Sequence, residues 1–197
     1  MGHHEGMTTA SADVFYRGLD FFGDVLAQAG DGQWDNPSPC EGWTALDVVG
    51  HLCTSLDMGT SILKGEQPTR PDVANPRDVV DGDPAAYYGS LAASCRTALA
   101  GASLDDVRDT PMGPRTVAQG LAFPAIDLYV HGWDLGQALG VDVQIPDDVI
   151  AFAHEYLDPI PEDAMRGPQG AFAAEADAAD GATASDRFIA WTGRTPL

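Results

Sequence analysis

Apolar residues recur at intervals of three and four along four long stretches of this chain, which is the pattern of amphipathic helices. In the first stretch they are Val14, Phe15, Leu19, Phe22 and Leu26. The pattern predicts four long helices, over residues 10–29, 45–64, 84–100 and 116–139. Two shorter helices are predicted over residues 146–157 and 185–191.

Local signals at the helix ends support these boundaries. Thr44 followed by Asp47 resembles a capping box, with Asp in place of the usual Glu. Asp83 precedes Pro84, and proline is favoured at the first position of a helix. Gly140 follows the longest apolar run, where a helix is expected to end.

The segments between the predicted helices carry few strand signals. Residues 31–42 are expected to form an ordered loop, and residues 65–82 a long connection that can cover a pocket. Residues 141–145 alternate as a strand would, but a single strand has no partner, and residues 167–184 fit no element. The fold class expected is all-α, a bundle of four long helices.

Length and charge narrow the classes of function. At 197 residues the chain fits one domain, expected over residues 10–197 behind a disordered or tag-like terminus over residues 1–9. The net charge of -20, with ten basic residues against thirty acidic ones, argues against nucleic acid and against anionic membrane surfaces. No uncharged apolar run reaches the roughly 18–20 residues of a membrane-spanning helix. Three cysteines without CxxC spacing suit a reduced compartment, and the protein is expected to be cytoplasmic.

One pair of polar residues stands inside the longest apolar run. Asp127 and His131 are four residues apart, so they share one face of the predicted helix. His51 lies in a second predicted helix, and facing helices of a bundle commonly supply inward-pointing metal ligands. Two imidazoles and a carboxylate suit zinc with an open position, while ferrous iron, nickel, manganese and cobalt remain alternatives. The same pair could instead be only a helix-stabilising contact.

Other residues are weaker candidates. Asp134 could orient a ligating histidine or be a solvated acid, and Trp43 is interpreted as a core or pocket-wall residue. His154 has no recognisable partner, and Cys53 is interpreted as a small core residue. Three arginines could clamp a carboxylate or serve ordinary surface and capping roles: Arg115, Arg187 and Arg194.

Two histidine-containing motifs resemble a known family. Residues 39–52, Pro-Cys-Glu-Gly-Trp-Thr running into Asp-Val-Val-Gly-His-Leu, look like the first signature of the mycothiol-dependent, maleylpyruvate-isomerase-like family of actinobacteria, within the DinB/YfiT-like superfamily. Residues 127–135 resemble its second signature, and residues 186–196 resemble the close of its short, single-domain members.

The resemblance implies a DinB/YfiT-like four-helix bundle with a C-terminal extension and a divalent metal, usually zinc, held by His51, Asp127 and His131. It also implies mycothiol as the thiol cosubstrate and an electrophilic small molecule as the substrate, with a homodimer left open. The characterised isomerase has Glu where this chain has Asp127, and it carries an additional C-terminal domain.

The implied activity is that of an enzyme in which a metal-bound thiolate attacks the electrophile, either as an S-transferase or as a cis–trans isomerase. Two other classes stay open at this point: a metal- or small-molecule-binding protein without catalysis, and a metal-dependent hydrolase.

Overall fold

The computed structural model describes residues 2–111, 113–166 and 170–197, with side chains described from residue 10 onward. Its bundle consists of α1 (Gly2–Leu26), α2 (Ala45–Leu63), α3 (Pro84–Ala100) and α4 (Val117–Leu139). A 3-10 turn, η1 (Pro76–Val79), and a hairpin of β1 (Val107–Thr110) and β2 (Gly113–Thr116) lie in the connections. Three further helices follow the bundle: α5 (Asp147–Leu157), α6 (Glu162–Arg166) and α7 (Ala184–Trp191).

The all-α prediction is confirmed, with a DinB-like bundle of four long helices and a C-terminal extension. The predicted starts of α2 and α3 are confirmed, because Thr44 and Asp47 form a capping box and the Asp83 carboxylate accepts a hydrogen bond from the Ala86 N–H. The first helix ends three residues early, at Leu26, and its backbone is helical from Gly2. The division of the chain into residues 1–9 and residues 10–197 stays a prediction.

Periodicity did not indicate the hairpin, nor the short helices η1 and α6. Each strand has only four residues, and these include Arg108, Asp109 and Arg115, so no apolar alternation marks them. The strands are antiparallel, with Val107 opposite Thr116 and Thr110 opposite Gly113. The strand-like segment 141–145 joins no sheet in the part of the chain that the structure describes, although Val143 and Ile145 are buried.

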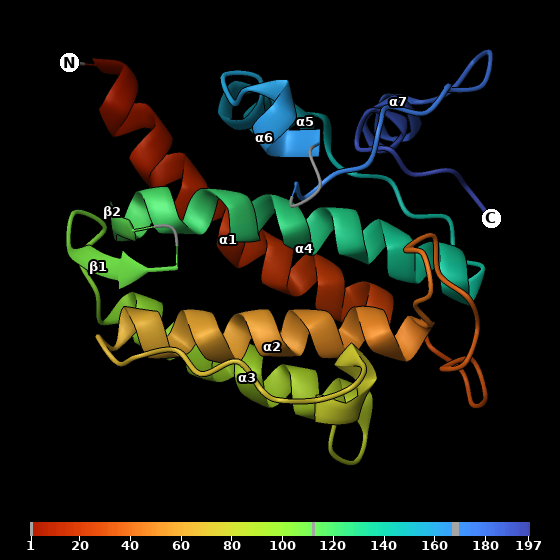
Figure 1. Ribbon diagram of the computed structural model, residues 1–197, viewed down its shortest axis with the longest axis horizontal. Helices are drawn as coiled ribbons and strands as arrows, with labels where there is room; N and C mark the ends of the chain where they lie inside the picture. Colours follow the sequence, from red (N-terminus) through yellow and green to blue (C-terminus); the bar gives the residue numbers. More distant parts are fainter. Residues whose placement is uncertain (1, 112, 167–169) are drawn as a thin grey trace.

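Helix α4 forms the centre of the molecule, with α1 packed along it and α2 on another side (Figure 1). The approach of α1 is close, because a Cβ added at Gly132 would lie 2.6 Å from the Phe21 ring. The Tyr129 hydroxyl donates a hydrogen bond to the carbonyl of Val14 at 3.3 Å. The helix that carries two of the predicted ligands is therefore held from several sides.

The C-terminal extension covers α4 on the side away from α2 (Figure 1). Phe188 and Trp191 of α7 stack at 6.0 Å between ring centroids, and the His154 ring of α5 contacts both. Within the described residues, no helix combines the length and apolar character needed to cross a membrane.

Candidate metal centre between α2 and α4

The first turns of α2 place His51 at the bundle interior. The Asp47 carboxylate accepts hydrogen bonds from the N–H and the hydroxyl of Thr44, and it also accepts one from the N–H of Arg77 in η1. Gly50 permits this contact, since a Cβ there would lie 2.0 Å from the carbonyl oxygen of Pro76. The connection 65–82 is thereby fixed against α2 beside His51.

The three predicted ligands meet between α2 and α4. Nε2 of His51 lies 3.3 Å from Oδ2 of Asp127, and Nε2 of His131 lies 3.4 Å from Oδ1 of the same carboxylate. One donor atom from each residue lies within 4.8 Å of the others. Ligand atoms on a tetrahedral zinc with bonds of about 2.0–2.1 Å are about 3.3–3.4 Å apart, so these donors are compatible with such an ion.

The cluster is open on one side. The side chain of His51 is 29% exposed and that of Asp127 18%, whereas that of His131 is only 8% exposed. A bound ion would therefore be reached past His51 and Asp127, with His131 at the rear.

Charge couples the three residues. Burial alone would raise the pKa of Asp127, but the charge of His131 and the hydrogen bond with His51 hold that pKa below its ordinary value. Burial would lower the pKa of His131, but the charge of Asp127 and the hydrogen bond with Asp134 raise it to about 10. Binding of a metal at Nε2 would have to displace a proton from this nitrogen.

A second carboxylate fixes the far side of His131. Nδ1 of His131 lies 2.9 Å from Oδ2 of the fully buried Asp134. Nε of Arg194, from the segment after α7, donates to both oxygens of Asp134 at 2.8 and 2.9 Å. The Cys40 thiol donates to Oδ2 of Asp134 at 3.2 Å. This network orients the imidazole so that Nε2 faces Asp127.

Asp134 thus occupies the orienting position that the sequence allowed for it, whereas the role of Cys40 was not foreseen. Cys40, His131 and Asp134 also bring one donor atom each within 4.8 Å of the others. Because Asp134 and Nδ1 of His131 already bind each other, we interpret this group as support for His131. The only sequence signal for Cys40 was its place in the motif over residues 39–52.

Trp43 forms part of the wall around the histidines. Its ring centroid lies 5.1 Å from that of His51 and 5.9 Å from that of His131. The interpretation of Trp43 as a wall residue is consistent with this position.

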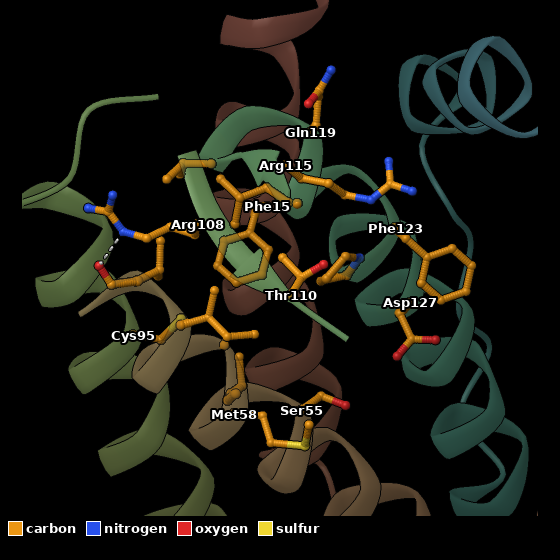
Figure 2. A pocket seen from close by; sticks show the side chains of 18 of the residues that line it. Phe15, Ser55, Met58, Cys95, Arg108, Thr110, Arg115, Gln119, Phe123 and Asp127 are labelled. Carbon is orange, nitrogen blue, oxygen red and sulfur yellow. Dashed lines mark hydrogen bonds between the residues drawn. The ribbon is translucent and has the colours of Figure 1, made fainter. Parts of the chain in front are cut away.

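A cavity of about 300 Å³ with largely apolar walls adjoins the cluster, and Asp127 lines it (Figure 2). Both α2 and α4 contribute walls, and the hairpin lines the cavity at the end of α4 opposite His131. The other elements that contribute lining residues do so through Phe15, Arg70, Cys95 and Tyr156. The carboxylate of Asp127 is therefore shared between the histidine cluster and a space large enough for a small molecule.

The remaining candidates lie in different surroundings. Arg194 binds Asp134, the exposed Arg187 donates to the carbonyl of Ala182, and Arg115 lines the cavity. His154, for which the sequence offered no partner, pairs with Asp158 at 3.1 Å. Cys53 is buried, as expected for a core residue, and burial raises the pKa of its thiol to about 12.

Comparison with known proteins agrees with the fold and with the motifs. Two strains of Mycobacterium tuberculosis have an uncharacterised protein that is 28% identical to this chain over 187 residues, covering 91% of this chain and 94% of theirs. Two crystal structures of the mycothiol-dependent maleylpyruvate isomerase, one of a histidine-to-alanine mutant, match with TM-scores of 0.57 and 0.60. Each is 14% identical, and the match covers 74% of this chain and 67% of the isomerase.

The family model described as the mycothiol maleylpyruvate isomerase N-terminal domain matches residues 15–136, more than half of the chain. This range contains His51, Asp127 and His131. The chain therefore belongs to the family of the mycothiol maleylpyruvate isomerase N-terminal domain.

Proposed function

We propose that this protein is a mycothiol-dependent enzyme that binds a divalent metal, zinc in the first instance, on His51, Asp127 and His131. The observation that carries the proposal is the convergence of these three donors at 3.3 and 3.4 Å beside a cavity that Asp127 also lines. Membership of a family named for a mycothiol enzyme supports mycothiol as the thiol.

When bound, a divalent metal would supply the Lewis acidity that holds a thiol as thiolate near neutral pH. His51 and Asp127 flank the open side of the cluster, so they would orient the incoming sulfur toward the cavity. Asp134 and Arg194 would keep the His131 ring in place from behind. The apolar walls would exclude water from the electrophile.

Two outcomes of thiolate attack are compatible with this site. If the sulfur bonds to a carbon that carries a leaving group, that group departs with the bonding electron pair and the product is a thioether. If the sulfur adds to an activated alkene, the former double bond can rotate, and the thiolate then leaves to give the other isomer. In both cases the thiol proton passes to solvent, and in the second the thiolate regains one.

The arrangement favours thiol chemistry over hydrolysis. A metal hydrolase needs a general base next to the bound water. Asp134, the carboxylate behind His131, is engaged by Arg194 and Cys40 and is fully buried. Glu41 is exposed on the loop before α2.

The test combines metal analysis with a thiol assay. We expect about one metal per chain by elemental analysis and, after cobalt substitution, a thiolate-to-cobalt absorption band when mycothiol is added. We also expect metal-dependent loss of the thiol with an electrophilic acceptor such as 1-chloro-2,4-dinitrobenzene. Metal without the band or the thiol loss would contradict the enzyme proposal and favour a binding protein, and no metal would contradict the site itself.

A further inference from the structure

The cavity beside the cluster is elongated along α2 and α4. From Asp127, its lining extends along α4 to Val117, where the helix begins and the hairpin closes the space. At 1.5 Å per residue, this distance along the helix axis is about 15 Å. The apolar side walls come from both helices, through Leu52, Leu56, Ile62, Leu121, Pro124 and Leu128.

The charged side chains that line this cavity are mostly positive. Apart from Asp127, its charged lining residues are Arg70, Arg108 and Arg115. These are three of only ten basic residues in a chain whose net charge is -20. Positive groups gathered in an apolar recess of an otherwise acidic protein attract an anion to that recess.

The hairpin register makes Arg115 the best-placed anion partner. Arg108 and Arg115 lie directly opposite each other, an arrangement that disfavours folding because like charges repel. Arg108 offsets this by pairing with Asp106 at 3.0 Å and donating to the carbonyl of Leu63 at 3.4 Å. Figure 2 shows its guanidinium pointing away from Arg115.

Arg115 has no comparable protein partner. Its Nε is buried without a hydrogen bond, and none of the carboxylates in the described residues lies within ion-pair distance of it. In Figure 2 its side chain extends toward Phe123, on the same side as Asp127. A buried guanidinium nitrogen without an acceptor is costly, and a carboxylate is the group that matches a guanidinium in shape and charge.

We infer that the cavity binds an elongated apolar carboxylic acid, with its carboxylate on Arg115 and its hydrocarbon body between α2 and α4. This deepens the proposed function and rests on it in one respect, namely that the end of the ligand near Asp127 carries the electrophilic carbon. Because the lining extends about 15 Å along the α4 axis, the cavity offers room for a hydrocarbon body as well as for the carboxylate.

Calorimetric titration of the full chain with decanoate, and with decan-1-ol as the uncharged control, tests the carboxylate site. Arg115→Gln should weaken decanoate binding at least about tenfold, as expected for loss of a charge-assisted hydrogen bond, and change decanol binding less than about twofold. Arg108→Gln removes the same charge from the same hairpin and should change decanoate binding less than about threefold. Equal losses in both variants, or equal affinity of the wild type for acid and alcohol, would overturn the assignment to Arg115.

A second pair of variants tests the position of the hydrocarbon body. Gly59 lines the cavity, and a Cβ there would meet nothing within 4 Å, so Gly59→Leu fills the space without a clash at its Cβ. Gly89 is also helical with nothing within 4 Å, but it is exposed on α3 outside the cavity. Gly59→Leu should abolish binding of both decanoate and decanol, whereas Gly89→Leu should bind both as the wild type does. Unchanged binding in Gly59→Leu would overturn the inference.

The titrations are made on metal-free and zinc-loaded protein, which separates this inference from the proposed function. Decanoate binding that depends on Arg115 in a protein without metal or thiol activity would support the inference and contradict the enzyme proposal. Thiol activity in a protein whose decanoate affinity is the same with and without Arg115 would overturn the inference alone.

Discussion

His131 is held between two carboxylates that have different roles. Asp127 faces the open side of the cluster together with His51, whereas Asp134 is buried and neutralised by Arg194. An imidazole whose Nδ1 is bound by a carboxylate presents its Nε2 in a fixed direction, which is the arrangement that tunes metal-ligating histidines. At the residue scale, the candidate centre therefore consists of three donors, His51, Asp127 and His131. A separate ion pair, Asp134 with Arg194, supports His131 from behind.

Replacement of the histidines tests the donors. His51→Ala and His131→Ala should each remove most of the bound metal, since two donors hold an ion far less tightly than three. Metal content of the purified variants, by elemental analysis, measures the effect, and circular dichroism should show helicity close to that of the wild type. His154→Ala is the matched control, because His154 is also helical and also paired with an aspartate, away from the cluster. Full retention of metal in both cluster variants would contradict the site.

Replacement of Asp134 tests whether this carboxylate orients His131. Asp134→Asn should weaken zinc affinity about 10- to 100-fold without removing a proposed donor. Asp158→Asn, which changes the corresponding partner of His154, should leave the affinity unchanged. Because Asp134→Asn also leaves Arg194 buried without its ion partner, it should cost about 3–5 kcal/mol of unfolding free energy. Competition titrations with a chelating dye, on protein shown to be folded, measure the affinity; wild-type affinity would contradict the orienting role.

At the element scale, the start of α2 joins three segments of the chain. Asp47 caps the helix and also accepts the N–H of Arg77, and Arg77 pairs with Asp35 of the preceding loop at 2.8 Å. The position of His51 therefore depends on the loop 27–44 and on η1 as well as on its own helix.

Gly50 provides a test of the η1 contact. Gly50→Ala would place a Cβ 2.0 Å from a backbone oxygen of Pro76, so α2 and η1 must separate. Although alanine favours a helix by about 1 kcal/mol over glycine, the overpacking should give a net loss of about 1–2 kcal/mol in urea unfolding. Gly89→Ala, at an open and exposed helical position, should instead gain about 0.5–1 kcal/mol. A gain in unfolding free energy in both variants would contradict this prediction, because it would show that α2 and η1 separate without destabilising the protein.

The cap of α2 also predicts a dependence of stability on pH. Burial raises the pKa of Asp47, but the hydrogen bonds from Thr44 and Arg77 outweigh burial and hold that pKa below its ordinary value of 3.8. The unfolded chain then binds the proton more readily, so the contribution of Asp47 is present above about pH 4 and is lost as pH falls through the lower, folded-state pKa. The difference in unfolding free energy between the wild type and Asp47→Asn should therefore shrink below pH 4. A constant difference from pH 7 to pH 3 would contradict this assignment.

The sequence predicts the elements that local signals define. The four long helices have a sustained 3.6-residue period, so their existence could be predicted, and the cap signals at Thr44 and Asp83 also indicate where α2 and α3 begin. The first helix begins at Gly2 rather than at the predicted residue 10. The hairpin could not be predicted, because its strands have only four residues each and, with Arg108 and Arg115 among them, show no hydrophobic alternation. The two strands pair because the end of α3 and the start of α4 hold the segment between them, so the pairing depends on how these helices pack.

The same distinction holds for the site. The spacing of Asp127 and His131 follows from one helix, and their meeting with His51 follows from a bundle with inward-facing ligands. The supporting network joins Asp134 to Arg194 and Cys40, which are 60 and 94 residues away. Their meeting depends on how the C-terminal extension and the loop before α2 pack on α4, and no local pattern encodes that packing.

At the scale of the whole molecule, charge is the dominant feature. A net charge of -20 on 197 residues repels itself, and only a minority of the acids lie beside an arginine, as Asp148 does beside Arg17. Self-repulsion favours the expanded, unfolded chain. Salt should relieve it, since the Debye length falls from about 8 Å at 0.15 M to about 3 Å at 1 M.

Raising sodium chloride from 0.15 M to 1 M should therefore increase the melting temperature, by about 2–4 °C for each 1 kcal/mol of repulsion that is screened. A variant that neutralises three exposed acids, Glu66→Gln, Asp81→Asn and Asp105→Asn, should melt higher at low salt and respond less to added salt. Scanning calorimetry of the wild type and of the variant at both salt concentrations measures how the melting temperature of each protein depends on salt. A melting temperature that falls with salt would mean that surface ion pairs such as Arg17 with Asp148 outweigh the repulsion. The acidic surface would then be balanced locally, and attraction of an anion to the cavity would have to depend on Arg115 and its neighbours alone.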